Sequence, residues 1–326
     1  MIRHLVLGFA LVAAAPVAAQ QTRSIAASER QQGAAAHPQL VAEFGGRYTG
    51  PQAAYVERVG KRVAVQSGLS NAANDFTVTT LDSPVENAFA IPGGYVYVTR
   101  QLLALMNSEG ELASVLGHEV GHVAARHAVK RNTRSTLGSL LAAGAGALTG
   151  SDLIGRGAGL ATRLYALGYS RGQEYEADGL GVRYIAAAGY SPYAAADMLS
   201  ALEAETTLTA QIEGRTGGLP SWASTHPNSA ERIRRAEKLA AATGRAEPPA
   251  RQDVTFLRML DGLPYDAKGS GRRIRIVTVK PGDTVPSLAR QMAYADHQVE
   301  RFTTLNGLGP NDTIAPGTLV KIVASR

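Results

Sequence analysis

The sequence of 326 residues contains no cysteine and few aromatic residues. Without cysteine, the chain can form no disulfide and can carry no lipid on an N-terminal cysteine. Phe, Trp and Tyr make up only 6% of the residues, whereas alanine and glycine are abundant. The hydrophobic content of 45% and the charged content of 18% are ordinary for a globular protein. We therefore expect a folded chain built from closely packed helices with small contact residues.

The sequence also lacks the basic patches that bind nucleic acids. The net charge is only +6, and the short basic runs at 232–235 and 272–275 contain no interleaved aromatic residue. Such runs are typical of a solvated helix face or a linker. We therefore expect no nucleic-acid partner.

Hydrophobic runs long enough to span a bilayer are missing as well. The segment 137–167 is rich in Gly, Ala and Leu, but its apolar part covers only 137–150. A spanning helix needs ~20 apolar residues. We expect a helical hairpin packed on the domain here, with peripheral membrane contact as the alternative.

The N-terminus reads "MIRHLVLGFALVAAAPVAAQQ". A basic start, a short apolar run and a small-residue end form the pattern of a secretory signal peptide. Cleavage after Ala19 would make residues 1–19 the signal peptide. Export without cysteine is compatible with the periplasm of a Gram-negative bacterium.

Changes in composition divide the rest of the chain. Residues 20–50 are predicted to be a leader with little fixed structure, 51–263 the main domain, 264–273 a linker and 274–326 a small second domain. Hydrophobic periodicity predicts a helix over 51–65, a strand over 76–81 and two extended pieces within 86–99. The expected fold class is α+β, mainly helical with a small sheet.

The clearest chemical motif is His118-Glu119-Val120-Gly121-His122. Ser108 and Glu111 form a capping box, so a helix should begin near Glu109 and include this motif. Residues four apart on a helix differ by only 40° and share one face. Two histidines in this arrangement can hold one zinc ion, with the adjacent glutamate as a general base.

A third ligand must come from elsewhere, because a catalytic zinc usually takes three protein ligands. Continued helix geometry would place His127 on the opposite side, so we interpret it as a packing or surface histidine. The best remaining donors are Glu174 and Asp178, which lie four apart on a predicted helix. Spacing alone does not decide which of them binds the metal, or whether both belong to a solvated acidic face.

Four ordered stretches resemble a known family: "NAFAIPGGYVYVT", "ELASVLGHEVGHVAARH", "SRGQEYEADGLG" and "STHPNSAERI". They look like the successive signatures of the HtpX/CAAX-prenyl-protease/BepA family of gluzincin zinc metallopeptidases. The match covers roughly residues 45 to 263. It resembles the soluble, periplasmic BepA-like branch more than the branches with several membrane-spanning helices.

The resemblance implies a role for each residue that matches a family motif. It implies one Zn²⁺ per chain, held by His118, His122 and Glu174, with Glu119 as general base and Asp178 orienting a ligand histidine. His226 would lie near the metal, either stabilising the transition state or gating the zinc, and Arg232 would have a supporting role. Extended substrate would bind along an edge strand at Asn87, Ala88, Phe89 and Ala90.

The last part of the chain resembles a LysM module, a βααβ fold that binds N-acetylglucosamine polymers such as peptidoglycan. Within 274–323, "VKPGDT", "LNGL" and "PGTLVKI" match in order, whereas Pro286 departs from the usual pattern at its position. The module is therefore expected either to bind peptidoglycan or only to pack against the main domain.

Together these observations predict a periplasmic zinc endopeptidase that acts on misfolded or unassembled envelope proteins. Two alternatives share the same motifs. One is an assembly factor for envelope or outer-membrane proteins whose protease is largely latent, and the other is a peptidase that cuts peptidoglycan cross-links.

Overall fold

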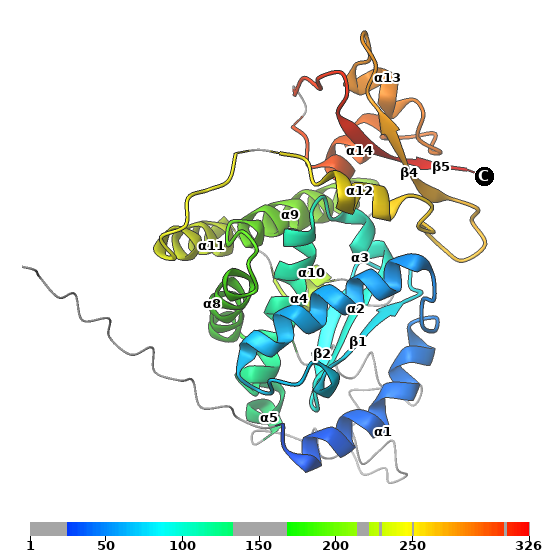
Figure 1. The fold of residues 1–326 in the computed structure, drawn as a ribbon. Helices are drawn as coiled ribbons and strands as arrows, with labels where there is room; N and C mark the ends of the chain where they lie inside the picture. Colours follow the sequence, from blue (N-terminus) through cyan, green and yellow to red (C-terminus); the bar gives the residue numbers. More distant parts are fainter. Residues whose placement is uncertain are drawn as a thin grey trace, which may run out of the picture.

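The computed structural model describes residues 25–132, 168–213, 222–227, 230–249, 251–309 and 312–325. The predicted signal peptide at 1–19 and the apolar segment at 137–167 lie outside these residues. Helices surround a small sheet, and a second sheet lies at one end of the molecule (Figure 1). The fold is α+β, as the sequence predicts. Within the described ranges, no helix is both long and apolar enough to cross a bilayer.

The central sheet contains β1 (Thr77–Leu81), β2 (Ala88–Ile91) and β3 (Tyr95–Thr99) in the order β1-β3-β2. β1 runs parallel to β3, and β2 runs antiparallel to it. Gly93 and Gly94 connect β2 to β3 with φ angles of +92° and +83°. Residues with a Cβ rarely adopt such angles, so glycine is needed at this turn. The two extended pieces predicted within 86–99 are confirmed, and β2 lies at an edge of the sheet.

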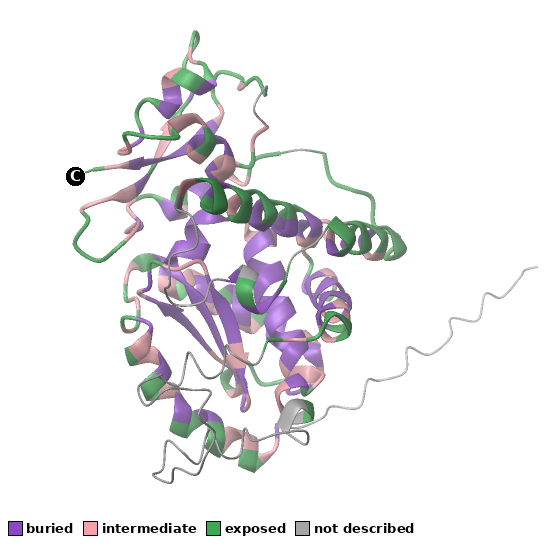
Figure 2. Cartoon of the chain, turned by 180° about the vertical axis from the view of Figure 1, so that it is seen from behind, coloured by how far each residue is buried: buried purple, intermediate pink, exposed green. Residues whose placement is uncertain are grey.

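Three helices form the layer that positions the site: α2 (Pro51–Ala64), α4 (Glu109–Ala124) and α8 (Arg171–Ala187). α4 packs against both α2 and α8, and it also contacts β2. Its central position buries the helix on most sides, which Figure 2 shows in purple.

Helix α1 (Ala27–Glu43) lies against the sheet and corrects the prediction of a leader with little fixed structure. Ala36 and Leu40 of this helix, and Phe44 immediately after it, are buried in a small cluster with Phe89 and Tyr97. These apolar residues recur every four positions, which is a helical period. The Gln/Ala-rich composition of 20–50 concealed that period.

The remaining elements of the main body are short connections or outer helices. They are α3 (Arg100–Leu105), α5 (His127–Asn132), α9 (Ala194–Glu213), α10 (Trp222–Thr225), α11 (Ala230–Ala242), α12 (Val254–Leu260) and the 3-10 turns η1 (Val65–Ser67) and η2 (Ala73–Asp75).

The C-terminal part has the predicted βααβ order: β4 (Arg273–Thr278), α13 (Val285–Ala289), α14 (Gln298–Asn306) and β5 (Leu319–Ala324). β4 and β5 pair antiparallel. Pro286 occupies the first turn of α13, after a capping box formed by Thr284 and Ser287. Proline fits a first helical turn because the backbone N–H that it lacks has no intrahelical partner there. The unusual proline is therefore compatible with the fold.

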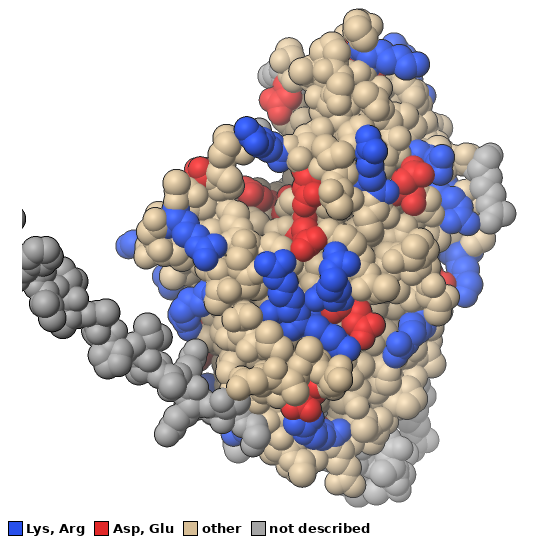
Figure 3. All heavy atoms as spheres, viewed as in Figure 1, with Lys and Arg blue, Asp and Glu red and all other residues tan. Residues whose placement is uncertain are grey.

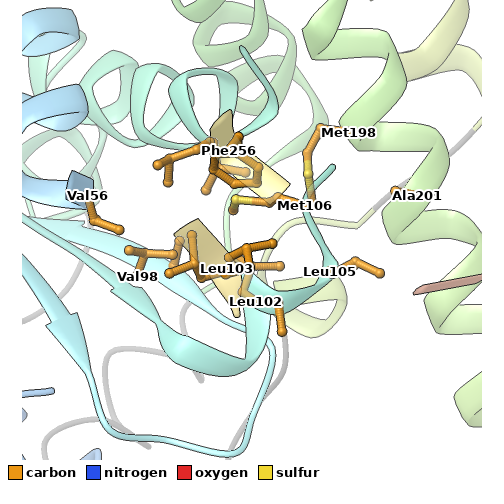
Figure 4. Close-up of a cluster of buried hydrophobic side chains, with 14 of the residues drawn as sticks. Val56, Val98, Leu102, Leu103, Leu105, Met106, Met198, Ala201 and Phe256 are labelled. Atoms are coloured by element: carbon orange, nitrogen blue, oxygen red, sulfur yellow. The ribbon is translucent and has the colours of Figure 1, made fainter. Parts of the chain in front are cut away.

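One hydrophobic core extends from the main body into this C-terminal part. Val98, Leu102 and Met106 pack with Phe256 of α12 and Met198 of α9, as the close-up shows (Figure 4). The same cluster of buried residues continues into the C-terminal part through Phe302, Leu305, Val320 and Ile322. The two parts are therefore packed together rather than loosely joined.

Lys321 of β5 is a buried polar link between the two parts. Its side chain is fully buried, and its ammonium group donates hydrogen bonds of 2.8 to 2.9 Å to the carbonyls of Ala104, Leu105 and Met106. These carbonyls lie at the C-terminal end of α3, where helical carbonyls lack intrahelical partners. Lys321 satisfies them.

Arg100 fixes the other end of α3 to the segment expected to be a linker. Its guanidinium donates to the carbonyls of Pro264 and Asp266 at 3.0 and 2.6 Å, and to Asp82 at 2.6 Å. Pro264 also forms a β-bridge with Arg273. Residues 264–266 are thus held to the main body.

Basic and acidic side chains are interspersed on the face shown in Figure 3.

Candidate active site and metal centre

The predicted site helix is α4, and it begins where the capping box indicates. The Ser108 side chain accepts a hydrogen bond from the backbone N–H of Glu111, and the helix runs from Glu109 to Ala124. His118 and His122 project from one face and are almost completely buried, with 2.9 Å between their Nε2 atoms. The expected pairing of the two histidines on one helical face is confirmed.

Helix α8 brings its carboxylates to the site because glycines let it lie close to α4. A Cβ on Gly181 would lie 3.0 Å from the backbone nitrogen of His118, and one on Gly121 would lie 2.9 Å from the Ala177 carbonyl oxygen. Side chains at these two positions would push the helices apart. At this close approach, Glu174 and Asp178 both reach the histidines.

Four residues place one possible ligand atom each within 4.8 Å of all the others: His118, His122, Glu174 and His226. Around His118 Nε2, the nearest ligand atoms are His122 Nε2 at 2.9 Å, His226 Nδ1 at 3.2 Å and Glu174 Oε2 at 3.6 Å. Ligand atoms 2.0–2.1 Å from a tetrahedral zinc ion lie about 3.3 Å from one another. The donor set and its spacing therefore fit zinc.

Both helix-borne histidines are in the form that binds a metal. Burial lowers the pKa of His118, against Asp178 and Glu174, which raise it. Burial also lowers the pKa of His122 well below its usual range, and the neighbouring His118 and His226 lower it further. At neutral pH both rings are therefore uncharged, and a neutral ring nitrogen can donate its lone pair to a metal.

Asp178 contacts Nδ1 of His118, whereas the other possible ligand atoms lie around Nε2 of the same ring. Its Oδ1 lies 2.9 Å from His118 Nδ1, and Arg232 donates to both of its oxygens at 2.7 and 2.8 Å. Burial raises the pKa of Asp178, but hydrogen bonds from Arg232 and His118 outweigh it and hold that pKa below its usual range. Asp178 is thus a carboxylate that accepts from the His118 ring, an arrangement that orients metal-binding histidines.

Arg232 was given only a supporting role from the sequence, and the structure places it between both carboxylates of α8. Besides Asp178, its Nη1 lies 2.9 Å from Glu174 Oε2, and it also donates to the carbonyl of His226. One buried guanidinium thus holds Glu174, Asp178 and the backbone of His226 in place. The pattern of these residues in the sequence gave no direct sign of this.

Glu119 is fully buried, yet neither oxygen of its carboxylate has a hydrogen-bond partner among the described residues. The nearest basic group is His226 Nε2, 3.6 Å from Oε1. Burial, and then the charge of Glu174, raise the pKa of Glu119 well above its usual range, against the charge of Arg232 and the nearby backbone N–H of Ala90. A buried carboxylate without partners is costly, so its persistence suggests a group that is satisfied only when water or substrate is bound.

His226 follows α10 and is stacked on Trp222, with ring centroids 4.2 Å apart. Its Nδ1 lies 3.0 Å from Glu174 Oε1, so His226 is itself one of the possible metal ligands. Trp222 also packs against His118 at 5.3 Å. This tryptophan was not predicted as a site residue, although it is the only one in the chain and lies four residues before His226.

The prediction that His127 faces away from the site is wrong. α4 ends at Ala124, Arg126 adopts a φ of +53°, and a new helix begins at His127. This turn brings the buried ring of His127 back, so that its Nδ1 lies 2.9 Å from His122 Nδ1. The prediction failed because it assumed a continuous helix across 125 and 126.

The edge strand β2 borders a groove beside the metal cluster. The groove is lined by Ala90, Ile91 and Pro92, by His122, Val123, Arg126 and Ala128, and by Glu29 and Tyr169. Of the residues expected to bind substrate, Ala90 lines this groove, whereas the side chains of Ala88 and Phe89 are buried. The ring of Phe89 stacks on Tyr97 in the α1 cluster.

Tyr169 is a second aromatic residue of the site that was not predicted from the sequence. It stacks on His122 with centroids 3.8 Å apart and an interplanar angle of 25°. It lies just before α8, whose capping box of Ser170 and Gln173 begins the helix. A tyrosine next to a cap carries no signal of its own, so sequence pattern could not have identified it.

The cluster is thus a buried group of histidines and a glutamate that could hold a metal ion, on an HExxH helix beside an edge strand. Comparisons with known proteins agree with this class of site. A model described as Peptidase family M48 matches residues 51–240, more than half of the chain, and one described as LysM domain matches 277–323. The chain belongs to peptidase family M48 and carries a LysM domain at its C-terminal end.

Individual relatives lead to the same family. The chain is 33% identical over 217 residues to the mitochondrial metalloendopeptidase OMA1 of Schizosaccharomyces pombe, covering 64% of this chain and 60% of that protein. It is 27% identical over 216 residues to the beta-barrel assembly-enhancing protease of Yersinia pestis, covering 63% and 42%. It is 31% identical over 159 residues to the beta-barrel assembly-enhancing protease of Escherichia coli (strain K12), and this match covers 45% of this chain and 32% of that protein. The matches thus span 60% or less of each relative's length.

Proposed function

We propose that the protein is a zinc-dependent endopeptidase that hydrolyses peptide bonds of misfolded or unassembled envelope proteins. The observation that carries the proposal is the convergence of His118, His122 and Glu174 beside a buried Glu119 that lacks hydrogen-bond partners among the described residues. A set of ligands next to an unpaired carboxylate is the arrangement that metal-assisted hydrolysis requires. Membership of peptidase family M48 supports the same reaction.

In this proposal His118, His122 and Glu174 hold one zinc ion per chain. The bound ion would supply Lewis-acid polarisation of the scissile carbonyl. Glu119 takes a proton from the attacking water and later delivers it to the leaving nitrogen. The raised pKa of Glu119 makes it a stronger base for the first step, and the proton that it gains there is the one it delivers in the second.

Substrate would add to the edge of the central sheet along residues 87–90. Because Ala88 and Phe89 bury their side chains, recognition there would come from backbone hydrogen bonds. Such bonds are available to any extended peptide, so specificity for sequence would be modest. A substrate of this kind must first be unfolded or unassembled.

His226 supports a second candidate, an assembly factor whose protease is largely latent. With His226 the cluster has four possible protein ligands, and a zinc site closed by four protein ligands is typical of structural rather than catalytic zinc. Displacement of His226 would open a position, whereas a His226 that stays near Glu119 would stabilise the transition state. A His226→Ala variant with raised proteolysis supports gating, and one with lowered proteolysis supports a catalytic role.

We also propose that residues 1–19 direct the chain to the periplasm, with 51–263 as the peptidase domain and 274–326 as the LysM domain. The LysM match suggests peptidoglycan as the partner of the C-terminal part. Retention of the full chain on purified sacculi would support this, and release of muropeptides would favour a peptidoglycan-directed peptidase. The full chain is needed because removing the module would expose the main-body surfaces that Lys321 covers.

The proposed activity is tested by measuring the metal content of the purified protein together with cleavage of an unfolded outer-membrane protein. We expect about one zinc per chain and cleavage that a chelator abolishes and added zinc restores. Cleavage that survives complete removal of metal would refute the proposal.

A further inference from the structure

We propose that His127 is a positioning residue for the metal centre, which fixes the ring of His122 in the form that binds the metal through Nε2. The inference rests on the proposed zinc site. It adds a residue to which the family resemblance assigned no role. Its basis is a chain of three groups that ends at a carboxylate: His122, His127 and Glu176.

The contacts of this chain are short and continuous. His122 Nδ1 lies 2.9 Å from His127 Nδ1, and His127 Nε2 lies 3.1 Å from Glu176 Oε2. His127 has no exposed surface, whereas the side chain of Glu176 is about half exposed. The ring is therefore held between a ligand and a solvated carboxylate.

The hydrogen-bond roles along this chain follow from the carboxylate at its end. Glu176 can only accept when ionised, so His127 must donate from Nε2. A neutral His127 then has a free lone pair on Nδ1 and accepts a proton from Nδ1 of His122. His122 consequently keeps its Nε2 lone pair, and this atom is the one that faces His118 Nε2 at 2.9 Å.

The opposite assignment would not serve a metal. If His122 accepted through Nδ1, its proton would sit on Nε2, directed at His118 and the other ligand atoms. A neutral His127 that donates its one N–H to Glu176 removes that alternative. Asp178 accepts the Nδ1 proton of His118 in a direct contact of 2.9 Å. Both histidines therefore keep the Nε2 lone pair, His118 through one carboxylate and His122 through His127 and Glu176.

The fold contains features that place His127 in this position. Arg126 has a positive φ, and the resulting turn returns the chain toward His122 immediately after α4. Tyr169 covers both rings, with centroid distances of 3.8 Å to His122 and 6.0 Å to His127. Glu176 comes from α8, two residues after Glu174, so one helix would supply both a ligand and the end of the supporting chain.

The experiment compares His127→Phe with His127→Asn in the full chain. Phenylalanine keeps an aromatic ring against Tyr169 but cannot accept a hydrogen bond, whereas asparagine retains an acceptor near the position of Nδ1. Zinc affinity is measured by competition with a chelator. We expect a 10- to 100-fold loss for His127→Phe, the usual effect of removing such a support, and a clearly smaller loss for His127→Asn.

Nitrogen-15 NMR of the histidine rings separates orientation from general damage to the fold. In the wild type we expect the proton of His122 on Nδ1, and in His127→Phe a mixture of the two ring forms. The inference is overturned if His127→Phe binds zinc as the wild type does, or if both variants lose zinc equally while His122 keeps its proton on Nδ1.

The outcome distinguishes this inference from the proposed function. A wild-type protein that fails to retain zinc contradicts the proposed function, and the ring form of His122 in the metal-free chain then still decides the role of His127. A wild type that retains zinc, with a His127→Phe variant that retains it equally, contradicts only the inference.

Discussion

Helix α4 carries two buried polar clusters, one in its first turn and one two turns later. In the first, Glu111 accepts hydrogen bonds from the backbone N–H of Asn107 and from Ser108, and Lys321 satisfies three carbonyls nearby. In the second, the histidine nitrogens converge on one another, and Glu119 has no hydrogen-bond partner among the described residues.

The difference shows how a buried polar cluster can be classified from its hydrogen bonds. In the first cluster, donors meet acceptors. Burial raises the pKa of Glu111 to about 7 and lowers the pKa of Lys321 to about 7, while the charge of each group favours the ionised form of the other. In the second, histidine nitrogens and the Glu174 carboxylate converge within 4.8 Å of one another, and a bound cation would complete the arrangement. We therefore interpret the first cluster as structural and propose the second as the functional one, although both lie on one helix and both are nearly inaccessible.

The largest effect that should separate the clusters is the loss of metal from Glu174→Ala. Removing a ligand should weaken zinc binding by more than about 100-fold, whereas Asp178→Asn, which leaves all ligands in place, should cost about 10- to 100-fold. Zinc retained after dialysis against a chelator gives the comparison. Equal retention in the two variants would mean that Glu174 is not a ligand.

An intermediate effect, on stability rather than on metal, is expected for Lys321→Met. The change leaves three carbonyls at the end of α3 without donors and Glu111 without its countercharge. A buried acceptor left without a donor costs about 1–3 kcal/mol, so we expect a loss of about 3 kcal/mol in the free energy of unfolding. Denaturant unfolding measures this loss, and zinc content should stay near that of the wild type. Loss of zinc without loss of stability would contradict the division between the clusters.

The smallest effect is expected from Ser108→Ala, which removes the cap of the site helix. Loss of an N-cap side chain costs about 1 kcal/mol. Thermal unfolding should show a small decrease, with Ser114→Ala as a matched control within the same helix. A decrease as large as that of Lys321→Met would mean that the first cluster depends mainly on the cap.

The sequence sufficed for the features that depend on local pattern. The capping box at Ser108, the HExxH motif, the strands around Gly93 and Gly94 and the βααβ order all follow from neighbouring residues. The family resemblance then pointed to Glu174, which spacing alone had left undecided against Asp178. In the structure both carboxylates reach His118, Glu174 on the side of Nε2 and Asp178 on the side of Nδ1.

The features that were missed depend on contacts between distant segments or on rare backbone angles. A positive φ at Arg126 is not foreseeable, because arginine seldom adopts it, and His127 was therefore placed on the wrong side. Lys321 was not singled out from the sequence, and its ammonium group finds its acceptors on α3, far away in the chain. Helix α1 was overlooked because its apolar period lies within a Gln/Ala-rich stretch.

The most direct test of the central claim is the zinc content and peptidase activity of Glu119→Gln. The substitution keeps the size of the side chain but removes its ability to act as a base. We therefore expect about one zinc per chain and proteolysis reduced by about 100-fold or more. Full proteolysis by this variant would contradict the account.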